Sequence, residues 1–317
     1  MVPRLMHCTA GAPMPGRACA IGRAGGHHGE ILQGLWWPPA KFRSDPVACL
    51  VTLPLAQGGC EAQFTPAIGR TIEVHPAWKV KAARAAHLAL DALGAGASGG
   101  LLRLNNPIAP GLGLGSSSSD VIATLRAVYN AFGVYPEPDR LARLAVAAET
   151  AADPLMYEDV VLFAQRDGVV LERWGSWRPD FLLVSIDTAP EAGGRDTLSL
   201  PLPRAHGMRA AYTRLVCQAR TAFRTRDAAA IAAVATCSAE LHQQTVALRG
   251  FEALHRLAGA SGALGLQIAH SGTIAGLLFP PQTAAEDLAA LLARVRALRM
   301  VPRGIFRTGA APCGAIA

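Results

Sequence analysis

The feature that most constrains this chain is a run of glycine and serine at residues 111–120, GLGLGSSSSD. The segment before it, LLRLNN at 101–106, is typical of a strand. After it, apolar residues recur at three- and four-residue steps from Val121 to Phe132, which predicts a helix that Gly133 ends. The serines therefore occupy a helix N-terminus, where free backbone N–H groups and the positive end of the helix dipole suit an anion such as phosphate.

Local chemistry leaves two interpretations of this run open. Glycines at 111, 113 and 115 permit positive φ and let a phosphate approach the backbone, while serine hydroxyls can donate to phosphate or ligate Mg²⁺. The alternative is an ordinary capped helix, because Ser117 stands three residues before Asp120, the spacing of a capping box. A Walker A loop is excluded because its lysine is absent. The G-x-S-x-G around Ser98 follows a helix and precedes a strand, which is the reverse of a nucleophile elbow.

Composition narrows the class of protein. With 317 residues, 51% hydrophobic content and a mean hydropathy of +0.25, a folded chain with real cores is expected. No apolar run approaches about 18 residues, so no membrane span is expected. The net charge is +7, but basic residues are scattered and lysines number only three, so nucleic-acid binding is not expected. The seven cysteines form no CxxC pair, which favours neither disulfides nor zinc and indicates a cytoplasmic protein.

Irregular alternation of helices and antiparallel-looking strands predicts an α+β architecture in two lobes, with a seam near 178–181. Residues 1–18 are expected to be a disordered extension or to precede the true start. The predicted strands lie at 47–56, 101–106, 160–163, 168–172 and 181–187, with a strand–turn–strand unit at 265–279. The predicted helices lie at 77–93, 117–132, 138–150, 205–224, 227–247, 251–260 and 284–298.

Two further segments accompany the central run. GRAGGHHGEILQG at 22–34 is a glycine-rich turn ending at Gly29–Glu30, and GLQIAHSGTIAGLLF at 265–279 contains a turn of small residues. The central run resembles the P-x-x-x-G-L-G-S-S-A-A loop of the GHMP kinase superfamily, which phosphorylates galactose, homoserine, mevalonate and related alcohols. The flanking segments stand where that superfamily has its first and third motifs, so the resemblance spans roughly residues 20–300. It implies a two-lobed fold, with a ribosomal protein S5 domain 2-like ATP-binding lobe at 19–180 and a ferredoxin-like lobe at 181–317.

Within that superfamily the chain is most similar to the L-threonine kinases of the cobalamin pathway. The similarity lies in GE-x-x-QG at 29–34, SSSSDVIAT at 116–124, DPLMYEDVVLF at 153–163 and AHSGT at 269–273. It implies a cytoplasmic, ATP- and Mg²⁺-dependent kinase that makes O-phospho-L-threonine, and it would allow a homodimer. Kinases of homoserine, serine or another small alcohol, and an inactive nucleotide-binding regulator, are the alternatives. The chain departs from the family at His27 and His28, where threonine kinases carry small residues or cysteine, and in a longer spacing from Glu149 to Asp153.

The resemblance also implies roles for individual residues. Ser117 and Glu149 are expected to ligate Mg²⁺, and Asp153 to orient or deprotonate the substrate hydroxyl, with Ser117 also catalytic; a solvated helix end is the alternative for the two acids. For the adjacent histidines, no third metal ligand is evident. The residues expected to bind ATP are Pro110, Gly111, Gly113, Leu114, Gly115, Ser116, Ser117, Ser118 and Ser119. Those expected to contact the acceptor are Glu30, Gln33, His28, Asp153, Ser271, Gly272 and Thr273.

Overall fold

The computed structural model of the protein describes residues 19–37, 45–111, 113–192, 199–201, 207–270 and 272–309. The predicted extension at 1–18 and the predicted substrate contact Ser271 lie outside these residues. In the described part of the chain, no helix is both long and apolar enough to cross a membrane.

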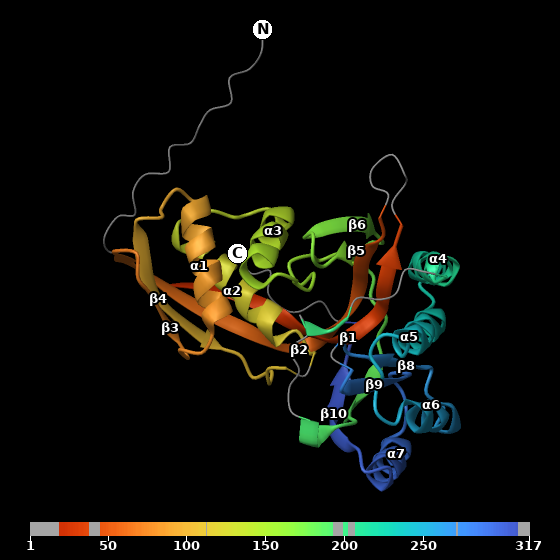
Figure 1. Ribbon diagram of the computed structural model, residues 1–317. Helices are drawn as coiled ribbons and strands as arrows, with labels where there is room; N and C mark the ends of the chain where they lie inside the picture. Colours follow the sequence, from red (N-terminus) through yellow and green to blue (C-terminus); the bar gives the residue numbers. More distant parts are fainter. Residues whose placement is uncertain are drawn as a thin grey trace.

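One mixed sheet runs through both halves of the described chain (Figure 1). Its strands follow the order β10-β7-β9-β8-β1-β2-β4-β3, while β5 pairs with β2 and β6 with β5. The N-terminal strands are β1 (Ala20–Trp36), β2 (Val47–Ile68), β3 (Ile72–His75), β4 (Ser98–Asn105), β5 (Val161–Ala164) and β6 (Val169–Arg173). The C-terminal strands are β7 (Leu182–Asp187), β8 (Gly265–Ile268), β9 (Ile274–Phe279) and β10 (Val301–Arg307).

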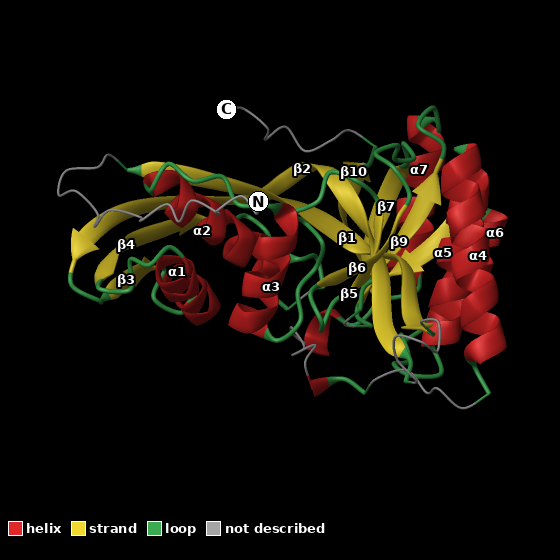
Figure 2. Ribbon diagram, turned by 90° about the horizontal axis from the view of Figure 1, so that it is seen from above, coloured by secondary structure: helices red, strands yellow, loops and turns green. Residues whose placement is uncertain are grey.

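Helices cover the two halves of this sheet separately (Figure 2). The first group packs on β1, β2 and β4 around one apolar core and comprises α1 (Val80–Ala92), α2 (Ser116–Ala131) and α3 (Pro138–Glu149). The second group packs on the C-terminal strands and on β1 and comprises α4 (Arg209–Thr225), α5 (Ala228–His242), α6 (Phe251–Ala260) and α7 (Ala285–Ala297). A short 3₁₀ helix, η1, spans Pro190–Ala192. Almost every residue of α2 is buried, which makes it the central helix of the N-terminal half.

The predicted α+β class is confirmed, and the predicted helices are present with ends shifted by a few residues. The prediction for residues 22–34 is wrong, because this segment is not a turn but the middle of the long strand β1. Glycine-rich sequence suggested a turn, yet at Gly22 a Cβ would collide with the backbone of α2, so glycine is needed there for close packing. The segment 77–93 also begins its helix later than predicted, and Trp78 lies outside it, 58% exposed. The predicted division at residue 180 stays a prediction.

Candidate active site

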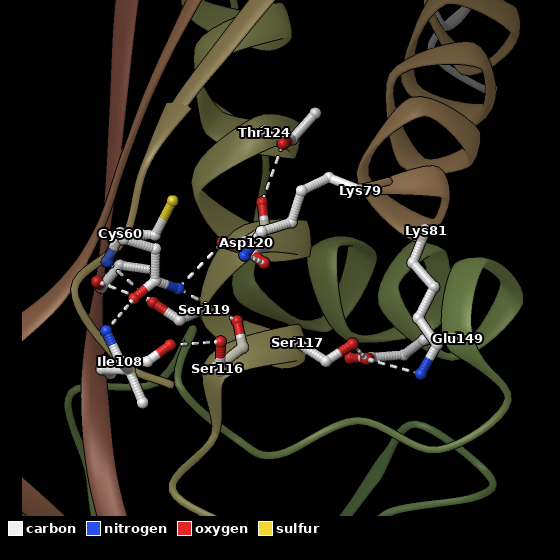
Figure 3. Close-up of polar contacts among 12 residues, drawn as sticks. Cys60, Lys79, Lys81, Ile108, Ser116, Ser117, Ser119, Asp120, Thr124 and Glu149 are labelled. Atoms are coloured by element: carbon white, nitrogen blue, oxygen red, sulfur yellow. Dashed lines mark hydrogen bonds and ion pairs between the residues drawn. The ribbon is translucent and has the colours of Figure 1, made fainter. Parts of the chain in front are cut away.

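The glycine–serine run forms the entry to α2. Gly115 is the N-cap residue, with a left-handed φ of 72°, and α2 begins at Ser116. No side chain caps this helix, so the capping-box interpretation is wrong. The carboxylate of Asp120 instead accepts a hydrogen bond from Lys79 (Figure 3). It accepts a second one, at 2.8 Å, from the side-chain amide of Asn106. The first backbone N–H groups of α2 are therefore left to a ligand, as the phosphate interpretation requires.

A cavity of about 350 Å³ opens in front of this helix end. Its wall contains the predicted ATP-binding residues except Ser119, whose hydroxyl is buried and accepts a hydrogen bond from the Cys60 backbone N–H. The same cavity brings Glu30 together with Glu149 and Asp153, which lie more than 100 residues further along the chain. The three acids and the glycine–serine run thus line one cavity.

Glu149 faces the serines of α2 from the last turn of α3 (Figure 3). The hydroxyl of Ser117 donates to one carboxylate oxygen at 2.6 Å, and that of Ser118 donates to the other at 2.8 Å. The ammonium of Lys81 lies 4.0 Å away. Glu149 is only 3% exposed, so the solvated-helix-end alternative is wrong for it. Burial raises the pKa of Glu149 to about 7, against the opposing effect of the serine hydrogen bonds.

A bulge in β1 decides which side chains reach the cavity. His27 pairs with Pro54 of β2 and Glu30 pairs with Thr52, so three steps on β1 match two on β2. The extra residue is accommodated where Gly29 has a φ of 57°. Because side chains alternate along a regular strand, this added residue is what lets His27 and Glu30 face the cavity together.

His27 and Asp153 form an ion pair in this cavity. The Nε2 atom of His27 lies 2.9 Å from a carboxylate oxygen of Asp153, and its Nδ1 lies 3.2 Å from the carbonyl oxygen of Gly29. Burial alone would lower the pKa of His27, but the charge of Asp153, the hydrogen bond to it, the charge of Glu30 and the Gly29 carbonyl together outweigh burial and raise that pKa to about 9. Burial likewise opposes ionisation of Asp153, yet His27 and a hydrogen bond to Ser118 hold the pKa of Asp153 below its usual value.

Glu30 is a buried acid with an unused acceptor. One of its carboxylate oxygens is buried without a hydrogen-bond partner among the described residues. Burial raises the pKa of Glu30 to about 8, although His27, 4.0 Å away, opposes that rise. A buried acid that lines a cavity and lacks a partner is suited to a cationic or hydrogen-bond-donating ligand.

The structure does not bring every predicted substrate contact to the cavity. His28 faces the opposite side of β1, where it contacts Ser185 at 2.7 Å and Gln267. Gln33 is not among the residues that line the cavity. Its side-chain oxygen accepts a hydrogen bond from His270, which does line the cavity. Gly272 and Thr273 are buried beside β9 and are absent from the cavity wall.

Sequence reasoning also missed residues that line the cavity. Lys79 and Lys81 flank the start of α1, and Asn106 follows β4 and supports Asp120. Arg166 and His270 line the wall beside Asp153. One signal was available, because two of only three lysines in the chain stand in the single segment AWKVKAAR.

Part of the chain that forms the cavity matches a known family of protein domains. Residues 80–163, from α1 to β5, match the sequence profile described as the GHMP kinases N terminal domain. No curated protein sequence matches the chain significantly.

Solved structures match over nearly the whole chain at low identity. A homoserine kinase from Cytophaga hutchinsonii is 16% identical, with a TM-score of 0.64 over 93% of this chain and 96% of its own. The L. major mevalonate kinase in complex with R-mevalonate is 17% identical, with a TM-score of 0.61 over 94% and 97%. A protein designated MDDEF, in complex with MVAPP, AMPPCP and magnesium, is 15% identical, with a TM-score of 0.63 over 92% and 98%. Residues 80–163 thus carry the sequence profile of the GHMP kinases N terminal domain, and the fold over both halves is the one found in the solved homoserine and mevalonate kinases.

Proposed function

We propose that the protein is an ATP- and Mg²⁺-dependent kinase of a small hydroxy amino acid, with L-threonine as the first candidate. The observation that carries this proposal is the arrangement at the start of α2. A glycine loop and the uncapped helix end face the same cavity as a serine–glutamate pair and a separate carboxylate, Asp153.

The residues present fit the phosphate end of MgATP. Backbone N–H groups of the first turn of α2 can donate to an anion, and the ammonium of Lys81, 4.0 Å from Glu149, adds a positive charge nearby. Ser117 and Glu149 offer two oxygen ligands, the type that Mg²⁺ prefers. Bound there, the ion would neutralise charge on the phosphates. A protein of similar fold is solved with AMPPCP and magnesium, which supports binding of a nucleotide and Mg²⁺ here.

Asp153 is the group that would act on the acceptor. Its carboxylate accepts a hydrogen bond from the acceptor hydroxyl and so fixes the attacking oxygen beside the phosphate loop. The oxygen forms a bond to the γ-phosphorus, the bond from that phosphorus to the β,γ-bridging oxygen breaks, and ADP leaves. The hydroxyl proton passes to Asp153. Ser118 ties the two halves of the site together, because its hydroxyl donates to Glu149 and accepts from the Asp153 backbone N–H at 3.0 Å.

Recognition of an amino acid follows from the charges at the far side of the cavity. The unpaired oxygen of Glu30 suits the ammonium group, which mevalonate and galactose lack. Arg166 and His270, which line the same wall, suit a carboxylate. This chemistry does not separate threonine from homoserine or serine, so the preference for threonine depends on the motif similarity. A nucleotide-binding regulator without activity is the second candidate, and the complete set of acids argues against it.

The test is release of ADP from MgATP with a panel of acceptors: L-threonine, D-threonine, L-serine, L-homoserine, mevalonate and no acceptor. We expect release with L-threonine above all others, and O-phospho-L-threonine as the product by mass spectrometry. Preference for L-homoserine or L-serine would support the assignment as a kinase and change the proposed substrate. Binding of MgATP without release for any acceptor would favour the regulator.

A further inference from the structure

We propose that His27 is a protonated imidazolium whose role is to hold Asp153 as an ionised, oriented carboxylate beside the phosphate loop. The inference assigns a positioning residue to the proposed kinase site and therefore rests on the proposed function. Its central element, the charge on His27, can be measured whether or not the protein is a kinase.

The hydrogen-bond partners of the ring fit this charge. The carbonyl oxygen of Gly29, 3.2 Å from Nδ1, can only accept a hydrogen bond, so Nδ1 carries a proton. The carboxylate of Asp153, 2.9 Å from Nε2, also accepts when ionised, so Nε2 carries the second proton. The ring is buried, and two protons with two acceptors leave it fully satisfied. The raised pKa of His27 and the lowered pKa of Asp153 agree that the charges lie on these two groups.

Four acids line the cavity, and burial opposes ionisation of three of them, Glu30, Glu149 and Asp153. Burial raises the pKa of Glu30 to about 8 and that of Glu149 to about 7, whereas the pKa of Asp153 is lowered. Asp153 is the one that a ring nitrogen of His27 contacts directly. The contact with His27 thus favours the ionised form of Asp153 although that carboxyl group is buried.

His27 also has a fixed place relative to the phosphate loop. A Cβ on Gly115, the N-cap of α2, would collide with the His27 ring, so the ring packs directly on that loop residue. The ring therefore touches the loop on one side and Asp153 on the other. An acceptor hydroxyl bound to Asp153 is consequently held next to the helix end where the transferred phosphate would lie.

The charged groups around the ring come from four elements. Asp153 follows α3, Glu30 lies on β1, and Glu149 and Lys81 face the cavity from α3 and α1. His270, in the turn between β8 and β9, has a pKa lowered by burial despite the charge of Asp153. His28, adjacent on β1, is held neutral in the core by burial, which lowers its pKa to about 3. Asp153 is the only acceptor among these groups that a described hydrogen bond links to His27.

The same cluster could be taken for a metal site, because ligand atoms of His27, Glu30 and Asp153 lie within 4.8 Å of one another. A ring that carries protons on both nitrogens has no lone pair for a metal ion. Metal ligation by His27 is therefore the competing arrangement, and the first experiment distinguishes the two.

That experiment is ¹⁵N NMR of the histidine side chains in the full-length protein, with His27 assigned through its backbone resonances. We expect both His27 nitrogens to be protonated at pH 7.5, with titration near pH 9, and no change when Mg²⁺, Mn²⁺ or Zn²⁺ is added without nucleotide. A neutral ring at pH 7.5, or loss of the Nε2 proton on addition of a metal, would overturn the proposal. This readout survives a failure of the kinase assignment, which the acceptor panel tests separately.

The second experiment compares H27Q, which removes the charge, with H27K, which keeps it. In H27Q we expect kcat at pH 7 to fall by about 10-fold or more and the acidic limb of kcat/KM to move up by about one pH unit, because Asp153 loses its counter-charge. In H27K the acidic limb of the pH profile of kcat/KM should return toward its wild-type position. The control is H255Q, which removes a histidine on the surface of α6 that pairs with Glu240 at 3.4 Å, and should leave the profile unchanged. Equal profiles for H27Q and H27K, or a wild-type profile for H27Q, would reduce His27 to a packing role.

Discussion

Replacing Glu149 with glutamine should make the folded protein more stable while it abolishes activity. The carboxylate is 97% buried, and its pKa rises from 4.5 in the unfolded chain to about 7 in the fold. The folded state therefore holds a proton between these two pH values that the unfolded state releases, so stability falls as pH rises through that window. One unit of pKa difference corresponds to about 1.4 kcal/mol, so the charge costs the folded protein about 3 kcal/mol above pH 7. The E149Q amide has nearly the same shape and carries no charge.

The assay is thermal unfolding of wild type and E149Q from pH 4.5 to pH 8.5 with EDTA present. We expect equal stability near pH 4.5 and a melting temperature about 5 °C higher for E149Q at pH 8. The matched control is E172Q. Glu172 receives two hydrogen bonds from Arg220, at 2.7 and 2.6 Å, which hold its pKa below the usual value, so this variant should be less stable at pH 8. If E149Q is less stable than wild type at pH 8, or its advantage does not depend on pH, the description of Glu149 as a buried charge whose desolvation outweighs its hydrogen bonds is refuted.

Three further predictions concern the same site. S117A should lose about 2–4 kcal/mol of transition-state stabilisation with an unchanged circular-dichroism spectrum, because the hydroxyl that reaches Glu149 at 2.6 Å is absent; an unchanged rate would remove Ser117 from the site. D153N should lower kcat by roughly 10²–10⁴-fold, the usual range for proton transfer, and a loss confined to KM would limit Asp153 to acceptor binding. MgATP at millimolar concentration should raise the melting temperature of wild type more than that of E149Q, and no shift for wild type would contradict both the kinase and the regulator.

The central parts of the site could be predicted because their signal is local. The run at 111–120 predicts a loop followed by a helix. Glu149 ends, and Asp153 follows, a helix that the spacing of apolar residues predicts. The direction of the side chains on β1 could not be predicted, because it depends on a bulge whose only local sign is Gly29 among other glycines. For this reason the sequence suggested His28 as a contact, whereas of the two adjacent histidines it is His27 that lines the cavity. Lys79 and Asn106 were missed because their partner, Asp120, had a simpler explanation as a helix cap.

The bulge in β1 also makes the number of residues between His27 and Glu30 important. Two adjacent histidines lie in opposite surroundings, one ring charged in the cavity and the other neutral against Ser185 and Gln267. Removing or adding one residue between positions 27 and 30 would exchange these surroundings, burying a cation in the core and turning a neutral ring toward the phosphates. A substitution at one of these positions alters the contacts of one side chain, whereas a change of length alters the direction of several side chains at once. A designer who wishes to change the acceptor should therefore vary the residues that face the cavity and keep the number of residues in this segment constant.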